Sequence, residues 1–93
     1  MKITDVRVRI VPSSVGDGRL KAVASITIDG CFVVHDMKII AGAEGPFVSM
    51  PSRKSTDGTY KDIAHALNTE TREYVIRTIM SAYTDELAKE GQE

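Results

Sequence analysis

The sequence has 93 residues, the length of one domain with a modest core. Twelve Lys and Arg residues against thirteen Asp and Glu give a net charge of −1, which on its own argues against a nucleic-acid-binding protein. Cys31 is the only cysteine, so no intrachain disulfide can form, and a cytoplasmic location is the simplest expectation. The first residues become polar at once and no apolar run approaches the ~18 residues of a membrane span, so we expect neither a signal peptide nor a membrane segment.

Charge is distributed unevenly along the chain, and aromatic residues are few. Residues 1–65 carry nine cations and seven anions, whereas residues 66–93 carry three cations and six anions, so a local basic surface remains possible. Aromatic residues make up only 5% of the chain, and the core must therefore come from aliphatic side chains. A core this thin is compatible with a homodimer and equally with a marginally stable monomer.

Residues 2–11 alternate between apolar and polar side chains. Val6, Val8 and Ile10 fall on one side of the alternation, and charged residues fall on the other. A period of two predicts a half-buried strand. Residues 12–18 are rich in Pro, Ser and Gly and predict the turn that follows it.

Residues 19–28 and 31–40 are predicted to form a hairpin joined by Asp29-Gly30. A two-residue type I′ turn needs positive φ at both positions, which Asp tolerates and Gly adopts freely. Pairing Ile28 with Cys31 then puts one apolar set on a single face, with the pairs Ile26 with Val33, Ala24 with His35, Ala22 with Met37 and Leu20 with Ile39. This register predicts His35 as a packed core histidine and places Lys21 opposite Lys38 on the other face.

Residues 47–50 are predicted to form a short strand that ends at Pro51, because proline has no amide hydrogen to donate to a sheet. A polar, basic loop follows and closes at Asp57-Gly58. Residues 59–63 then return as a last strand.

The period changes after Asn68, which is a favourable N-cap. A helix over 69–89 is predicted, with an apolar stripe formed by Val75, Ile76, Ile79, Met80, Tyr83 and Leu87. The whole pattern predicts an α+β domain: a small antiparallel sheet of about five strands, rich in hairpins, covered on one face by the C-terminal helix.

Arg53 and Lys54 form the one pair of adjacent cations in a turn-rich segment, and Ser52 precedes them with a hydroxyl. Cations and hydroxyls of this kind bind phosphates through charge and short hydrogen bonds. Lys61 and Arg72 extend the candidate site, and Arg7, Arg9 and Arg77 are further cations that could join it. The alternative is an ordinary solvated loop. Phe47 and Tyr60 flank the basic segment and could stack on bases, although Phe47 is better explained as a core residue.

Motifs for catalysis or cofactor binding are absent from the sequence: there is no P-loop, no dinucleotide fingerprint and no nucleophile elbow. A zinc site from Cys31, His35 and His65 lacks any close-spaced ligand pair. His65 could orient the junction between the last strand and the helix, or act as an acid or base. We therefore expect no enzyme, no cofactor and no small-molecule substrate, and keep a small enzyme around His65 as a minor alternative.

Three blocks in this order resemble the SpoVG (stage V sporulation protein G) family: FVVHD at 32–36, FVSMPSRK at 47–54 and DIAH at 62–65, with ITDVR at 3–7 before them. The resemblance implies a small bacterial cytoplasmic regulator, homodimeric, that binds DNA and RNA to modulate gene expression and is linked to sporulation and septation. It implies nucleic-acid contact by Arg53 and Lys54, and by cations of the C-terminal helix, here Arg72 and Arg77. The competing interpretation is a protein–protein interaction module that does not bind nucleic acid.

Overall fold

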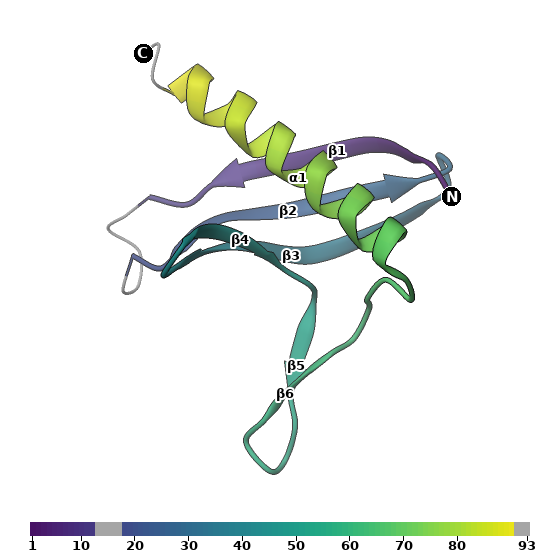
Figure 1. The fold of residues 1–93 in the computed structure, drawn as a ribbon, viewed down its shortest axis with the longest axis vertical. Helices are drawn as coiled ribbons and strands as arrows, with labels where there is room; N and C mark the ends of the chain where they lie inside the picture. Colours follow the sequence, from purple (N-terminus) through teal and green to yellow (C-terminus); the bar gives the residue numbers. More distant parts are fainter. Residues whose placement is uncertain (13–17, 91–93) are drawn as a thin grey trace.

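The computed structural model describes residues 1–12 and 18–90, which form an α+β fold in two parts (Figure 1). The first part is a four-stranded antiparallel sheet in the order β1-β2-β3-β4 with a helix across it; the second is a separate two-stranded sheet, β5-β6. The bounds are β1 Ile3–Ile10, β2 Leu20–Ile28, β3 Phe32–Gly42, β4 Gly45–Ser49, β5 Ser52–Lys54, β6 Tyr60–Asp62 and α1 Thr69–Glu90. The predicted fold class is confirmed. Most of the predicted turn at 12–18 lies outside the described residues.

Strand β1 keeps the predicted alternation. Val6, Val8 and Ile10 are half-buried and pack against the core, and the charged residues between them are exposed. The start of β1 is held at the β2–β3 turn, where the backbone amide of Lys2 donates to Asp29 Oδ1 at 3.0 Å and the Asp29 amide donates back to the Lys2 carbonyl at 2.7 Å. This end of the sheet is therefore fixed by both backbone and side-chain contacts.

The β2–β3 turn has the predicted backbone, but the predicted register is wrong. Asp29 and Gly30 have φ of 53° and 66°, as a type I′ turn requires. The Cys31 amide donates to the Ile28 carbonyl at 3.1 Å, yet the ladder pairs Ile28 with Phe32. Farther along, Lys38 pairs with Val23 instead of facing Lys21, because the register shifts by one more residue between Ile26 and Ala24.

The offset at the turn and a β-bulge in the middle of β3 together explain the largest error. Strand β3 contains one residue more than β2 at this point, and Asp36 adopts φ 64°, a left-handed conformation that Asp tolerates better than most residues. The extra residue reverses the alternation, so that Val34 and Met37 face the core while Val33 is 46% exposed. His35 is exposed, and its predicted core role is wrong.

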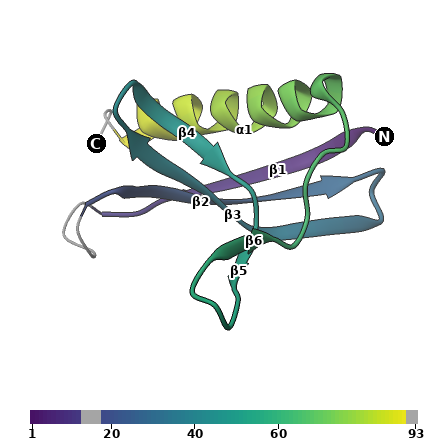
Figure 2. The same ribbon diagram turned by 60° about the horizontal axis from the view of Figure 1, so that its bottom comes forward.

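Strand β4 begins two residues before the predicted 47–50 and ends at Ser49. It pairs with β3 in the sheet and rises toward the helix (Figure 2). Phe47, expected in the core, lies beside Ile40 and is 48% exposed. Pro51 follows the strand as predicted and is buried.

Helix α1 begins where the sequence predicted. The Asn68 side-chain oxygen accepts a hydrogen bond from the Thr71 amide at 2.8 Å, so Asn68 is the N-cap. The helix lies across one face of the sheet, and no other element of the described chain crosses the opposite face (Figure 2). The buried core comes from β2, β3 and α1: Ala22, Ala24, Ile26, Met37, Ile39, Val75, Ile79 and Tyr83.

Candidate nucleic-acid interface

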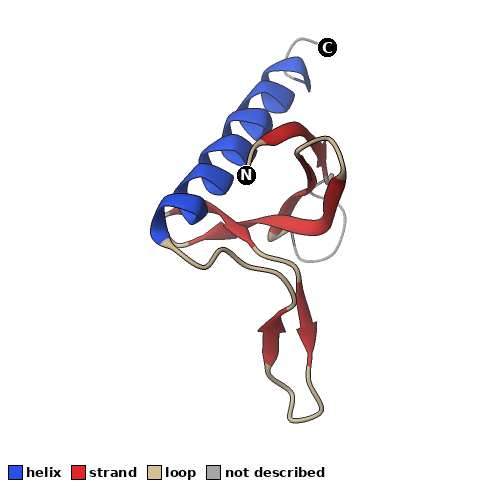
Figure 3. Cartoon of the chain, turned by 90° about the vertical axis from the view of Figure 1, so that its right-hand side faces the viewer, coloured by secondary structure: helices blue, strands red, loops and turns tan. Residues whose placement is uncertain are grey.

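The predicted basic loop is a β-hairpin that projects from the sheet and helix (Figure 3). We call residues 52–62 the arm. Its strands pair antiparallel, with Ser52 opposite Asp62, Arg53 opposite Lys61, and Lys54 opposite Tyr60. Residues 52–54 are therefore strand, where a loop was predicted. The sequence missed them because three polar residues carry no apolar alternation.

The register of the arm sorts its cations between two faces. Successive residues of a strand point to opposite faces, so Arg53 and Lys61 share one face, and Lys54 shares the other with Tyr60 and Asp62. The two adjacent cations of the sequence thus point apart. The close neighbour of Arg53 is Lys61, because directly opposed Cβ atoms lie about 4.5–5.5 Å apart.

The Arg53–Lys61 face concentrates positive charge, and neither cation forms an ion pair with an acid of the described chain. Both strands of the arm are exposed along their length. Among residues 1–12 and 18–90, the ion pairs are Arg7 with Asp5 and Lys89 with Glu86, and neither involves the arm. Like charges directly opposite on a sheet repel. A bound anion would relieve this repulsion.

The turn of the arm is held by hydroxyls around one carboxylate. Asp57 Oδ1 accepts hydrogen bonds from the Thr59 hydroxyl at 2.7 Å and from the Thr59 amide at 3.0 Å. Ser55 Oγ donates to the Thr59 carbonyl at 3.0 Å, and Gly58 takes φ 90° in the turn. The Thr59 hydrogen bonds lower the pKa of Asp57 below its ordinary value, because they stabilise the charged carboxylate.

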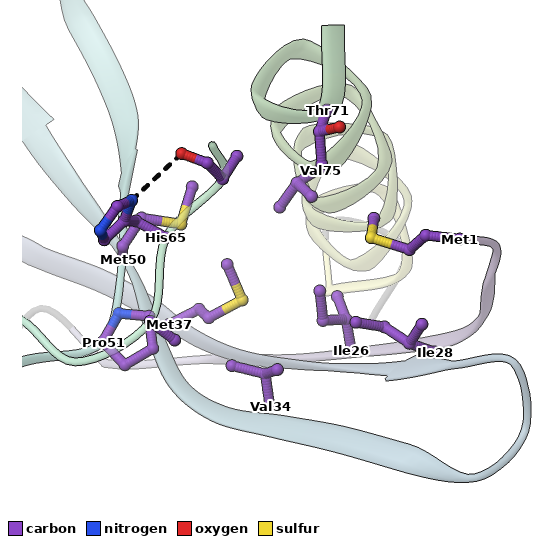
Figure 4. Close-up of a pocket in the computed structure, with 12 residues that line it drawn as sticks. Met1, Ile26, Ile28, Val34, Met37, Met50, Pro51, His65, Thr71 and Val75 are labelled. Atoms are coloured by element: carbon purple, nitrogen blue, oxygen red, sulfur yellow. Dashed lines mark hydrogen bonds between the residues drawn. The ribbon is translucent and has the colours of Figure 1, made fainter. Parts of the chain in front are cut away.

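The arm is anchored at a small apolar cavity under the start of the helix (Figure 4). The carbonyl oxygen of the buried Pro51 accepts a hydrogen bond from the Ile63 amide at 2.7 Å, just beyond the paired strands of the arm. A cavity of about 120 Å³ lies there, bordered by Met50, Pro51 and His65 together with core residues. His65 Nδ1 donates to the Ala66 carbonyl at 3.1 Å, which gives this histidine a contact within the junction.

The structure groups some predicted site residues and separates others. Ser52, Arg53, Lys54 and Lys61 all lie on the arm, and an open hollow is bordered by its three cations together with Asp62. Arg72 is exposed in the first turns of α1, on the sheet-and-helix part of the molecule. Counting back from Asp57-Gly58 as a two-residue turn would have matched Lys61 with Lys54. The observed loop has three residues, 56–58, and this shift of one places Lys61 opposite Arg53.

Of the exposed apolar side chains near the arm, the sequence analysis singled out Tyr60 and not the others. Tyr60 is 70% exposed on the Lys54 face, and Ile63 and Leu67, on the segment leading to the helix, are 67% and 91% exposed. Their presence next to the cations makes this end of the molecule amphipathic.

The described part of the chain has neither a metal site nor a membrane-spanning helix. Within residues 1–12 and 18–90, no three His, Cys, Asp or Glu side chains gather closely enough to hold a metal ion. In the same ranges, α1 is the one helix, and it lacks the apolar stretch needed to cross a membrane.

Comparison with known proteins gives a consistent result. The sequence model of the SpoVG family matches residues 1–85. A relative from Lachnospira eligens is 54% identical over 83 residues, covering 89% of this chain and 91% of the relative. Relatives from Agathobacter rectalis and Phytoplasma australiense are each 52% identical over 87 residues, covering 94% of this chain and 97% and 88% of their own lengths. All three are named "Putative septation protein SpoVG". The chain belongs to the SpoVG family.

Proposed function

We propose that this protein is a homodimeric, cytoplasmic DNA- and RNA-binding modulator of gene expression linked to sporulation and septation, with the arm as its nucleic-acid contact. One observation carries the proposal: Arg53 and Lys61 lie side by side on an exposed face, and neither forms an ion pair within the described chain. Phosphate oxygens are the natural partners of such a pair. No catalytic step, cofactor or small-molecule substrate is part of the function.

A homodimer accounts for binding by a chain whose net charge is −1. Two arms tethered in one particle raise the effective concentration of the second contact once the first has formed. Two copies of the Arg53–Lys61 face bring four cations to the nucleic acid, so the slope of log K against log salt is expected near −3 to −4 on duplex DNA, at about −0.9 per neutralised phosphate.

The test is fluorescence anisotropy with labelled duplex DNA and single-stranded RNA at two or more salt concentrations. Wild type is compared with Arg53→Ala, Lys61→Ala and Lys54→Ala. Lys61→Ala and Lys54→Ala are a matched pair, since each removes one lysine from the arm but from opposite faces. Sedimentation and circular dichroism establish beforehand that all variants dimerise and fold alike.

We expect Arg53→Ala and Lys61→Ala to weaken binding and each to make the salt slope less steep by about 2 in a dimer, about 1 per lost contact. Lys54→Ala is expected to change both quantities less. Equal losses from the two lysine variants would show that binding does not discriminate the faces, and unchanged binding in all three would place the contact outside the arm, at Arg72 or the β1 arginines.

A protein–protein interaction module is the second candidate, favoured by the exposure of Tyr60, Ile63 and Leu67. Exposed apolar residues gathered at one end of a domain are typical of contact surfaces. In the same experiment, a folded dimer that binds no nucleic-acid probe at low salt would favour this candidate.

A further inference from the structure

The arm has the dimensions of an element that fits the major groove of B-form DNA. That groove is about 12 Å wide and about 8.5 Å deep and admits a two-stranded β-ribbon. The strands of a ribbon lie about 4.8 Å apart, and at about 3.3 Å per residue the arm extends about 20 Å from Pro51 to Gly58. The arm therefore reaches the floor of the groove while the sheet and helix stay outside the phosphate backbones.

The distribution of charge decides which face turns inward. The Arg53–Lys61 face carries two cations, whereas the Lys54 face also carries the acid Asp62 and the aromatic ring of Tyr60. A groove lined by two rows of phosphates attracts the first face more strongly than the second. Cations inside the groove lie within a Debye length, about 10 Å, of both phosphate rows, so they still displace counterions.

The donors on this face match the acceptors on guanine. In the major groove, guanine presents N7 and O6, and a guanidinium or ammonium group donates to both. Arg53 also presents two parallel donors in a rigid fork, which a lysine at the same position lacks. Arg53 is thus the side chain best suited to read a base, and Lys61 supports it from the opposite strand.

We infer that the arm inserts into the major groove of B-form duplex DNA with its Arg53–Lys61 face toward the base edges and Arg53 donating to guanine. This rests on the proposed function, since it requires nucleic-acid binding by the arm. Groove insertion predicts tighter binding to duplex DNA than to duplex RNA, because the major groove of A-form RNA is deep and too narrow for side chains to read. It also turns the Tyr60 ring away from the bases.

The test compares four probes of one sequence by anisotropy: duplex DNA, the same duplex with every guanine replaced by 7-deazaguanine, the matching RNA duplex, and single-stranded RNA. Replacement by 7-deazaguanine removes the N7 acceptor and leaves the minor groove unchanged. Wild type is measured beside Arg53→Lys, which keeps the charge and loses the fork. Tyr60→Ala reports whether bases stack on the other face.

We expect wild type to bind the unmodified DNA duplex about fivefold or more tighter than the 7-deazaguanine duplex, the lower end of what a bidentate base contact discriminates. Arg53→Lys should lose most of this difference while keeping the salt slope. The RNA duplex should bind more weakly than the DNA duplex, and Tyr60→Ala should bind the DNA duplex as wild type does.

Other outcomes distinguish groove insertion from the proposed function. Equal affinity for unmodified and 7-deazaguanine DNA, with the RNA duplex bound equally well, overturns groove insertion and leaves the proposed function standing. Loss of DNA-duplex binding in Tyr60→Ala also overturns it, because the wrong face would be engaged. The absence of binding to all four probes overturns both.

Discussion

The sheet-and-helix body and the arm are stabilised in different ways. The body buries eight apolar residues from two strands and the helix in one core. The arm has strands of three residues each, with none of those residues buried, and relies on its ladder, its Asp57 turn and the Pro51 junction. A two-stranded hairpin by itself is marginally stable in water. The molecule thus separates the residues that hold the fold from those proposed to bind.

The two parts also differ in how close their cations lie to one another. In the body, Arg7 lies 3.0 Å from Asp5 and Lys89 lies 3.2 Å from Glu86. In the arm, Arg53 and Lys61 oppose each other directly. Repulsion between these two cations destabilises the hairpin. Such local destabilisation is typical of a binding site, here one for an anion.

The largest expected difference between the two parts is in the free energy of unfolding when a side chain is truncated to alanine. Ile79 is fully buried between helix and sheet, so Ile79→Ala should lower the free energy of unfolding by about 2–5 kcal/mol. Tyr60→Ala, on the exposed arm, should change it by less than about 0.5 kcal/mol. Urea denaturation followed by circular dichroism measures both. A large loss from Tyr60→Ala would mean that the arm is part of the cooperative core.

The body could be predicted from sequence because its signals are local and repeated. The alternation of Val6, Val8 and Ile10 gave the exposed and half-buried sides of β1, and the spacing of Val75, Ile79 and Tyr83 gave the buried stripe of the helix. Asn68 marked the helix start through the chemistry of its side chain. Each of these patterns reports a backbone period directly.

Single inserted residues caused the errors. The extra residue at the β2–β3 turn put His35 on the outer face, and the bulge at Asp36 then placed Met37 on the core face. Nothing in an alternating pattern reveals where a strand takes one extra residue. The arm was missed in part for a related reason: a hairpin exposed on both faces has no apolar period. Its cations were identified, but their pairing depends on register, which a polar ribbon specifies weakly.

Loss of the helix cap should have the next largest effect on the body. Asn68→Ala removes the acceptor for the Thr71 amide and should destabilise the protein by about 1 kcal/mol. Asn68→Asp keeps an acceptor at the same place and should remain near wild type, which makes it the matched control. Thermal unfolding of the three proteins tests this, and equal melting temperatures for Asn68→Ala and wild type would show that the cap contributes nothing.

Charge reversal in the arm should have a smaller effect, confined to that part. Lys61→Glu places a carboxylate opposite Arg53 and converts repulsion into attraction, a change of about 0.2–1 kcal/mol for such a cross-strand pair. We expect slower amide hydrogen exchange in residues 52–62, an unchanged midpoint of global unfolding, and weaker nucleic-acid binding. Faster exchange in the arm would contradict the cross-strand register.

The smallest expected effect is the pH dependence of the arm's turn. Hydrogen bonds from Thr59 lower the pKa of Asp57 below its ordinary 3.8, so the carboxylate stabilises the turn fully above about pH 4. That stabilisation should fade as the pH falls from the ordinary value through the lowered pKa, because over this range the open turn binds a proton more readily than the folded turn. The chemical shift of the Thr59 amide, followed by NMR between neutral and acidic pH, should report this transition while the core amides stay unchanged.

Two variants separate charge from hydrogen bonding at this position. Asp57→Asn keeps an oxygen that can accept from Thr59 and loses the titrating charge, so its turn should persist and the low-pH transition of Thr59 should vanish. Asp57→Ala loses both, and its Thr59 amide should exchange faster at every pH. If Asp57→Asn retained the transition, another group would be responsible for it. The turn would then owe its shape to Gly58 and the Ser55 contacts rather than to the carboxylate.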